Sequence, residues 1–301
     1  MENNNQNGRR PAIPHPVQRE VRQRCGFGCV VCGCPIYDYH HMKPYAEVQA
    51  HTANNLTLLC VTHHREVTNK LLTDDQVAAA NKNPKNVREG VSQPYALDFE
   101  GEGFQVNVGS NVIANRTKDE EGRCIGIPIA IDDQNIISFC VDAEGRVFLN
   151  MCLFDEFNRP LLQIHENALI YRQDVWDIKF SGNTLDVRQA VRKIFITLEF
   201  CPPNEMKITN GRILYNGIEL LVRPTHLFLV NKSSFLSQNY VSGLIGVQCG
   251  RNLRRFPVAI SLGGDEIDRY NYDRKAALAE ERKCLRKLEG LMGNENFVVP
   301  E

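Results

Sequence analysis

The sequence predicts an α+β protein, with an N-terminal metal-binding module, a mainly β domain after it, and a C-terminal helix. Cysteines and histidines concentrate between Cys29 and His64, at a density that metal binding explains most economically. Short β-rich runs separated by turn residues recur over residues 104–262. From about Asp265 to Met292 the chain is charged and has a helical pattern.

Composition narrows the class of protein. The 301 residues leave room for two domains, and 43% hydrophobic and 24% charged residues are ordinary for a globular chain. No apolar run approaches the ~18 residues of a membrane span, and no charged-then-apolar leader is visible. We therefore expect a cytoplasmic protein without a membrane partner. Its eleven cysteines are expected as reduced thiols, some of them on metal.

The N-terminal residues carry a weak positive bias. Residues 1–15 are rich in Asn, Gln and Pro, and we expect a disordered tail. A short helix is predicted over residues 16–25, where Arg19 and Arg22 share a face; phosphate contact and a solvated face explain them equally well. Residues 1–90 hold eleven Lys or Arg against eight Asp or Glu, while the whole chain has a net charge of −1. This bias is compatible with phosphate binding but does not establish it.

Two short spacings predict a structural zinc site. Cys29 and Cys32 are separated by two residues, and so are Cys60 and His63, so each pair can converge on one tetrahedral ion. The 27 residues between the pairs exceed the needs of a small finger but suit a hairpin. Ordinary buried cysteines are the alternative, and disulfides are not expected without a secretory signal. We predict a closed Cys3His site.

Four further residues remain once those ligands are assigned to zinc, namely His40, His41, Asn55 and His64. In this order, and framed by the two zinc pairs, they resemble the HNH endonuclease family, whose fold is a ββα-metal nuclease with a zinc knuckle. The matching stretches are Tyr39-His40-His41-Met42-Lys43-Pro44, Asn55-Leu56-Thr57-Leu58-Leu59-Cys60 and His63-His64. The resemblance predicts an HNH nuclease domain over residues 16–82 and says nothing about the rest of the chain.

The resemblance implies hydrolysis of DNA phosphodiester bonds and a role for each residue. His40 and His64 are implied as ligands of a catalytic divalent ion, His41 as the general base, and Asn55 as the residue that orients it. Such an ion compensates charge on the phosphate, and a neutral imidazole activates the water. Many relatives carry an acidic residue at the position of His40, so the ion stays open: magnesium or manganese, with zinc or nickel as alternatives.

Several nearby residues compete for these roles. His51 could be an extra ligand, but a solvated loop histidine is the favoured interpretation. Cys25 and Cys34 flank the first zinc pair, and the spacing makes them spare thiols. Asn54 competes with Asn55, and the Asn-Leu pairing favours Asn55.

The pattern around these residues predicts a hairpin and two helices. Residues 36–41 and 56–59 are expected as strands, and 61–70 as a helix that carries His64 in its first turn. Thr73-Asp74-Asp75-Gln76 is a capping-box pattern that opens a second helix, which must end before a proline at position 84.

Proline and glycine punctuate residues 83–103, which we predict as a linker. Beyond it, β-rich runs at a spacing of about ten residues suit a sandwich, a barrel or a short solenoid. The predicted strands are 127–131, 136–141, 147–154, 161–164, 168–171, 177–180, 193–200, 213–215, 218–222 and 227–230. Residues 263–301 are predicted as a helix and tail, with the helix packed on the β domain rather than in a coiled coil.

We therefore expect a metal-dependent DNA endonuclease, with RNA as an alternative substrate. The β domain is expected to target or regulate it through a partner protein or a regulatory ligand. Bacterial or phage defence is a natural setting, by analogy only. The alternatives are a non-catalytic zinc module that binds nucleic acid, and an interaction protein whose zinc unit is a scaffold. A scaffold needs only the four zinc ligands, so the remaining histidines favour catalysis.

Overall fold

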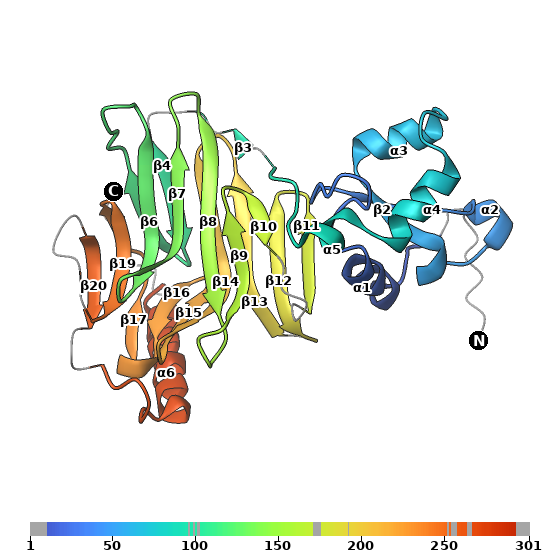
Figure 1. Cartoon of the computed structure of the whole chain (residues 1–301). Coiled ribbons are helices and arrows are strands. Elements are labelled where there is room, and N and C mark those ends of the chain that lie inside the picture. Colours follow the sequence, from blue (N-terminus) through green and yellow to red (C-terminus); the bar gives the residue numbers. More distant parts are fainter. Residues whose placement is uncertain are drawn as a thin grey trace. The chain divides into compact units, whose positions relative to one another are not determined.

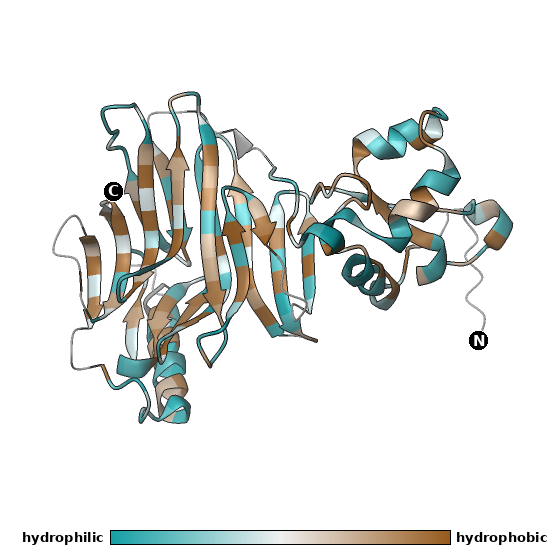
Figure 2. Ribbon diagram, in the orientation of Figure 1, coloured by the Kyte–Doolittle hydropathy of each residue, from teal (hydrophilic) through white to brown (hydrophobic). Residues whose placement is uncertain are grey.

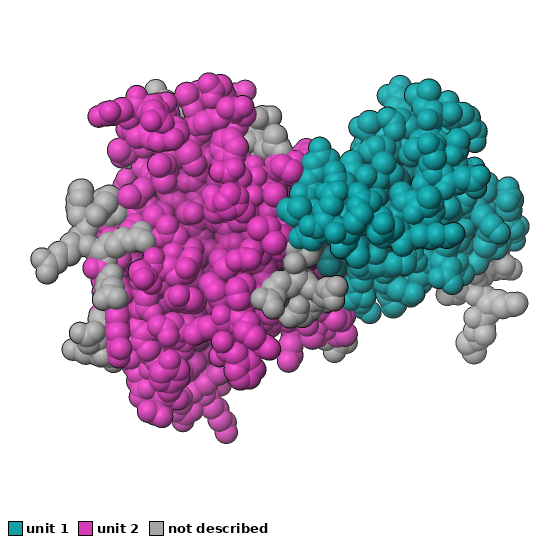
Figure 3. All heavy atoms as spheres, viewed as in Figure 1, with its two compact units in different colours: residues 1–93 teal, residues 94–301 magenta. Residues whose placement is uncertain are grey.

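The computed structural model describes residues 11–95, 97–98, 100, 103–170, 176–191, 193–251, 253, 258–263 and 267–292. The chain divides into two compact units, Met1–Gln93 and Pro94–Glu301, called unit 1 and unit 2 below (Figures 1 and 3). Helices dominate unit 1 and β sheets dominate unit 2, so the predicted α+β class is confirmed at this level. The predicted tail falls outside the described residues as far as residue 10. None of the described helices combines the length and apolarity that crossing a bilayer requires.

Unit 1 is built around a two-stranded hairpin. Its elements are α1 (His15–Arg24), β1 (Asp38–His41), α2 (Tyr45–Val48), η1 (Ala53–Asn55), β2 (Leu56–Leu59), α3 (Val61–Thr68), α4 (Asp74–Lys82) and α5 (Lys85–Glu89). β1 and β2 are antiparallel, with His40 opposite Thr57 and His41 opposite Leu56. Every residue of β2 is buried, which makes this strand the centre of the unit's core. The predicted hairpin and the helix after it are therefore present.

Two arginines of α1, Arg22 and Arg24, form hydrogen bonds with residues of the hairpin and η1. Arg22 is only 4% exposed, and its guanidinium donates to the hydroxyl of Tyr39 on β1. Arg24 donates to the backbone carbonyls of Ala53 and Leu56. Arg22 was expected either to contact phosphate or to lie on a solvated face. Its burial in the protein shows that both expectations are wrong. A buried guanidinium needs such acceptors, and here they tie α1 to the hairpin.

Helix α4 begins as its sequence predicts. The Thr73 hydroxyl accepts from the backbone N–H of Gln76, and the Gln76 side chain accepts from the backbone N–H of Thr73. This reciprocal pair satisfies two donors at the helix start. The helix ends at Lys82, before Pro84, as expected.

The first part of the predicted linker, residues 83–103, is not a linker, because it contains helix α5. The Asn86 side chain on this helix is fully buried and donates to the backbone carbonyls of Gly26 and Gly33. Pro84 and Gly90 are its two caps, and Gly90 has a φ of +70°, which favours glycine. Residues 83–93 therefore belong to unit 1, and the boundary follows Gln93.

Unit 2 is a sandwich of two sheets, one of the three architectures expected (Figure 1). Among the described residues, one sheet has eight strands, ordered β10-β9-β8-β7-β6-β19-β20 with β3 beside β8, and the other has ten, ordered β11-β12-β13-β14-β15-β16-β17 with β4, β5 and β18 attached. The strands are β3 (Leu97–Asp98), β4 (Phe104–Val108), β5 (Asn111–Asn115), β6 (Cys124–Ile131), β7 (Gln134–Val141), β8 (Arg146–Phe154), β9 (Pro160–His165), β10 (Ala168–Ile170), β11 (Asp177–Ser181), β12 (Thr184–Ala190), β13 (Lys193–Cys201), β14 (Glu205–Tyr215), β15 (Ile218–Arg223), β16 (His226–Leu229), β17 (Ser234–Leu236), β18 (Tyr240–Ser242), β19 (Ile245–Gly250) and β20 (Val258–Gly263).

Aromatic rings join the two sheets. Phe154 on β8 and Tyr215 on β14 have ring centroids 4.7 Å apart, and Phe104 on β4 lies 3.9 Å from Phe139 on β7. Hydrophobic and polar residues alternate along many of these strands (Figure 2), as half-buried sheets require. All ten predicted strands coincide with observed ones, but β12 and the strands near both ends of unit 2 were not predicted.

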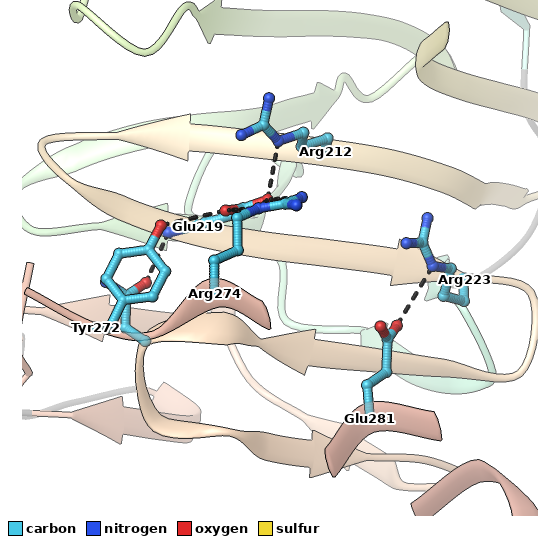
Figure 4. Close-up of polar contacts among 7 residues, drawn as sticks. Arg212, Glu219, Arg223, Tyr272, Arg274 and Glu281 are labelled. Carbon is cyan, nitrogen blue, oxygen red and sulfur yellow. Dashed lines mark hydrogen bonds and ion pairs between the residues drawn. The ribbon is translucent and has the colours of Figure 1, made fainter. Parts of the chain in front are cut away.

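Helix α6 (Arg274–Met292) packs on the larger sheet, as expected, through a buried carboxylate (Figure 4). The Glu219 side chain is 1% exposed. It accepts hydrogen bonds from Arg212 at 2.8 Å, from Arg274 at 2.8 Å and from the Tyr272 hydroxyl at 3.2 Å. A second carboxylate, Glu281, accepts from other residues of the same sheet. The helix is thus anchored by charge as well as by apolar contact.

We predict that Glu219→Gln lowers the free energy of unfolding of unit 2 by about 3 kcal/mol, because it breaks a buried ion pair. Burial would raise the pKa of Glu219, but hydrogen bonds from Arg274 and Arg212 outweigh it and lower the pKa. The ionised form therefore stabilises the fold above the ordinary carboxyl pKa, and this contribution is lost as the pH falls through the lowered value. Trp176, the single tryptophan, lies in unit 2 and reports its unfolding by fluorescence.

The matched control is Glu280→Gln, since Glu280 forms an exposed pair with Lys283 on α6 and should cost less than about 1 kcal/mol. Equal losses in the two variants, or a Glu219→Gln loss that persists unchanged in acid, would contradict the assignment.

Candidate metal centre and active site

The four predicted zinc ligands come together in unit 1. Cys29 and Cys32 lie in the turn after α1, Cys60 is the N-cap of α3, and His63 lies in the first turn of that helix. The ligand atoms of all four lie within 4.8 Å of one another. The Cys32 and Cys60 sulfurs are 3.7 Å apart, and the Nδ1 atom of His63 is 3.1 Å from the Cys60 sulfur.

These distances fit a tetrahedral zinc ion. Two sulfurs at ~2.3 Å from one zinc lie about 3.8 Å apart, close to the value for Cys32 and Cys60, which excludes a disulfide between them. The Nε2 atom of His63 lies 3.8 Å from the Glu66 carboxylate, which is longer than a hydrogen bond. The cluster can therefore hold the predicted structural zinc.

Thiolate formation is favoured within the cluster. The hydrogen bond from the Cys32 thiol lowers the pKa of Cys29 to about 4, against the opposing effect of burial. The same hydrogen bond and burial raise the pKa of Cys32. A bound cation would favour the thiolate form of these cysteines.

The turn that carries Cys29 is supported from two sides. The backbone N–H of Gly33 donates to the Cys29 carbonyl at 2.8 Å, and Val30 donates to Leu58 on β2 at 3.0 Å. Gly33 has a φ of +82°, and a Cβ at this position would meet the side chain of Asn86 at 2.2 Å. Helix α5 therefore packs against the turn and supports it, a contribution that the sequence did not predict.

The neighbouring thiols Cys25 and Cys34 are not members of the cluster, as the spacing predicted. Cys25 is fully buried, with its sulfur 3.9 Å from the Thr57 hydroxyl. Burial raises the pKa of both thiols, although the charge of Arg24 and a hydrogen bond from Thr57 oppose this at Cys25.

His40 and His64 face each other across β1 and α3. Their ring centroids are 5.1 Å apart, and the rings are nearly perpendicular, at 85°. Burial, followed by the neighbouring His64, lowers the pKa of His40, so this imidazole is neutral at pH 7. Consecutive residues of a helix point about 100° apart, which is why His63 faces the cysteines and His64 faces the hairpin. A neutral imidazole is the form that binds metal.

His41 is the last residue of β1 and contacts a different set of neighbours from His40. Its ring lies 5.8 Å from that of Tyr45 and 5.2 Å from that of His51. The Nε2 atom of His41 is 3.1 Å from Nδ1 of His51. His51, expected as a solvated loop histidine, is therefore part of this site.

Asn55 acts on the backbone rather than on the His41 ring. Its side-chain oxygen accepts from the N–H of Lys43 at 2.8 Å, and its amide donates to the Lys43 carbonyl at 2.9 Å. Asn55 is 8% exposed, whereas Asn54 is exposed. Asn55 thus holds the chain two residues beyond His41, at the end of β1, and any influence on the His41 ring passes through this backbone.

Comparison of this chain with protein-family models, with curated proteins and with solved structures finds no match. The site is therefore interpreted from its own geometry.

Proposed function

We propose that unit 1 is a metal-dependent endonuclease of the HNH type that hydrolyses DNA phosphodiester bonds. The observation that carries the proposal is the pairing of His40 with His64. Two adjacent residues of α3 belong to two different sites. His63 is a member of the cysteine cluster, while the ring of His64 lies beside that of His40 on the hairpin. A zinc scaffold does not require the second pair.

The proposed roles follow from donor chemistry. His40 and His64 would hold a divalent ion that, when bound, compensates charge on the phosphate. His41 would take a proton from the attacking water, and Asn55 would fix the backbone that carries His41. Imidazole ligands suit zinc or nickel, whereas magnesium and manganese prefer oxygen ligands. The order of cleavage activity among these ions therefore tests whether imidazoles hold the catalytic ion.

Unit 2 is proposed to target or regulate the nuclease. Among the cavities of its described residues, those of about 330 and 480 Å³ are both lined by Arg212 and Phe157. An arginine beside an exposed aromatic ring offers contacts to a regulatory ligand or a partner protein. A restrained nuclease suits bacterial or phage defence, and RNA remains the alternative substrate.

The test is incubation of the full-length, zinc-loaded protein with plasmid, single-stranded DNA and RNA. Magnesium, manganese, nickel and zinc are supplied separately, each with a chelated control. We expect DNA cleavage that requires added metal. His64→Ala should abolish it, and excess metal should restore a part, because one ligand remains.

The matched control is His165→Ala, since His165 is exposed on β9 of unit 2. It should cleave like the wild type. Nucleic-acid binding without cleavage under every ion, by the full chain and by residues 1–93 alike, would refute the nuclease and favour the non-catalytic zinc module.

A further inference from the structure

His51 lies in the loop between α2 and η1 and is held from three directions. Its Nδ1 atom is 3.1 Å from Nε2 of His41, and its Nε2 atom is 2.7 Å from the carbonyl oxygen of Pro11. Its ring stacks on Tyr45, with centroids 4.7 Å apart and 28° between the planes. A solvated loop histidine would not be fixed in this way.

These contacts define where the hydrogens lie. The Pro11 carbonyl can only accept, so the Nε2 atom of His51 must carry a hydrogen. In a neutral imidazole the other nitrogen is then an acceptor, so Nδ1 of His51 accepts. The hydrogen between the two rings must therefore come from Nε2 of His41. His41 consequently has its lone pair on Nδ1.

We propose that His51 is a positioning residue that fixes the tautomer and the ring orientation of His41. Its effect on cleavage rests on the proposed function. When Nδ1 of His41 takes the proton of the attacking water, the Nε2–H of the resulting cation still donates to His51, which stabilises it. The same logic applies to the orienting member of a hydrolase triad. No proton passes beyond His51, because the Pro11 carbonyl cannot accept one.

Two substitutions of His51 separate positioning from packing. His51→Phe keeps an aromatic ring against Tyr45 but removes both nitrogens. His51→Asn loses the stacked ring but offers an amide oxygen near the place of Nδ1. We expect His51→Phe to lower kcat by about 10- to 100-fold, as for other orienting residues, with KM, zinc content and DNA affinity unchanged. His51→Asn should retain most of the wild-type kcat.

An independent readout is nitrogen-15 NMR of the histidine rings in the full-length, zinc-loaded protein. We expect the hydrogen of His41 on Nε2 in the wild type and in His51→Asn, and a mixture of tautomers in His51→Phe. A His41 hydrogen on Nδ1 in the wild type, or wild-type kcat in His51→Phe, would overturn the proposal. If the wild type cleaves nothing, the proposed function fails, and the NMR result alone decides whether His51 positions His41.

Discussion

Replacing His41 with alanine is expected to lower the rate of DNA cleavage by about 100- to 10,000-fold, the usual contribution of a general base. His41 contacts Tyr45 and His51 and is not a member of the pair formed by His40 and His64, so its loss should leave metal binding intact. Single-turnover cleavage measures the effect, together with zinc content and DNA affinity, which should stay near wild type. Excess divalent metal should not restore the rate, in contrast to His64→Ala.

The control for this variant is Asn54→Ala, since Asn54 is exposed in the same unit. It should cleave at the wild-type rate. The variants should be assayed both in the full chain and as residues 1–93, so that regulation by unit 2 cannot hide activity. Undiminished cleavage by His41→Ala would remove His41 from the mechanism, even with the remaining site intact.

Loss of the structural zinc is expected to unfold unit 1. A four-ligand zinc site contributes on the order of 10 kcal/mol to folding, which is comparable with the whole stability of a typical domain, about 5–15 kcal/mol. Cys60→Ser should therefore give zinc-free protein in which unit 1 lacks a cooperative transition. Metal analysis and hydrogen exchange, resolved by peptide, measure this loss, and the peptides of unit 2 should stay protected.

The chain offers a matched control in Cys34→Ser, since Cys34 is half-buried, flanks the cluster and is not a member of it. This variant should keep one zinc and a folded unit 1. A well-folded Cys60→Ser protein that lacks zinc would show that the cluster is an ordinary set of buried thiols.

The cluster was predictable because local spacing encodes it. Two residues between Cys29 and Cys32, and between Cys60 and His63, bring each pair together within one turn, and the hairpin brings the pairs together. The contact of His41 with His51 has no such signal, since the two histidines lie ten positions apart, with α2 between them. Helix α5 escaped prediction because its capping proline and glycine are also the residues that mark linkers.

Some strands of unit 2 could not be predicted either, because their local sequence pattern is weak. Strand β12 has only two buried apolar residues, Leu185 and Val187, in a polar run, so its alternation is short. Strand β19 includes Gly246 and Gln248, which interrupt the apolar pattern, although all six of its residues are buried. Its parallel pairing with β6 spans more than a hundred residues, and no local pattern specifies such a partner.

The long-range pairing of β4 and β5 sets an order of events during synthesis. β4 pairs in parallel with β14, and β5 pairs with β18, so the larger sheet cannot close before residues 240–242 are made. All contacts internal to unit 1 are available once Gln93 is made. At ~5–20 residues per second, on the order of ten seconds separate these points on the ribosome. In that interval the nascent chain can bear a folded, zinc-loaded unit 1 ahead of a β sandwich that still lacks its partners.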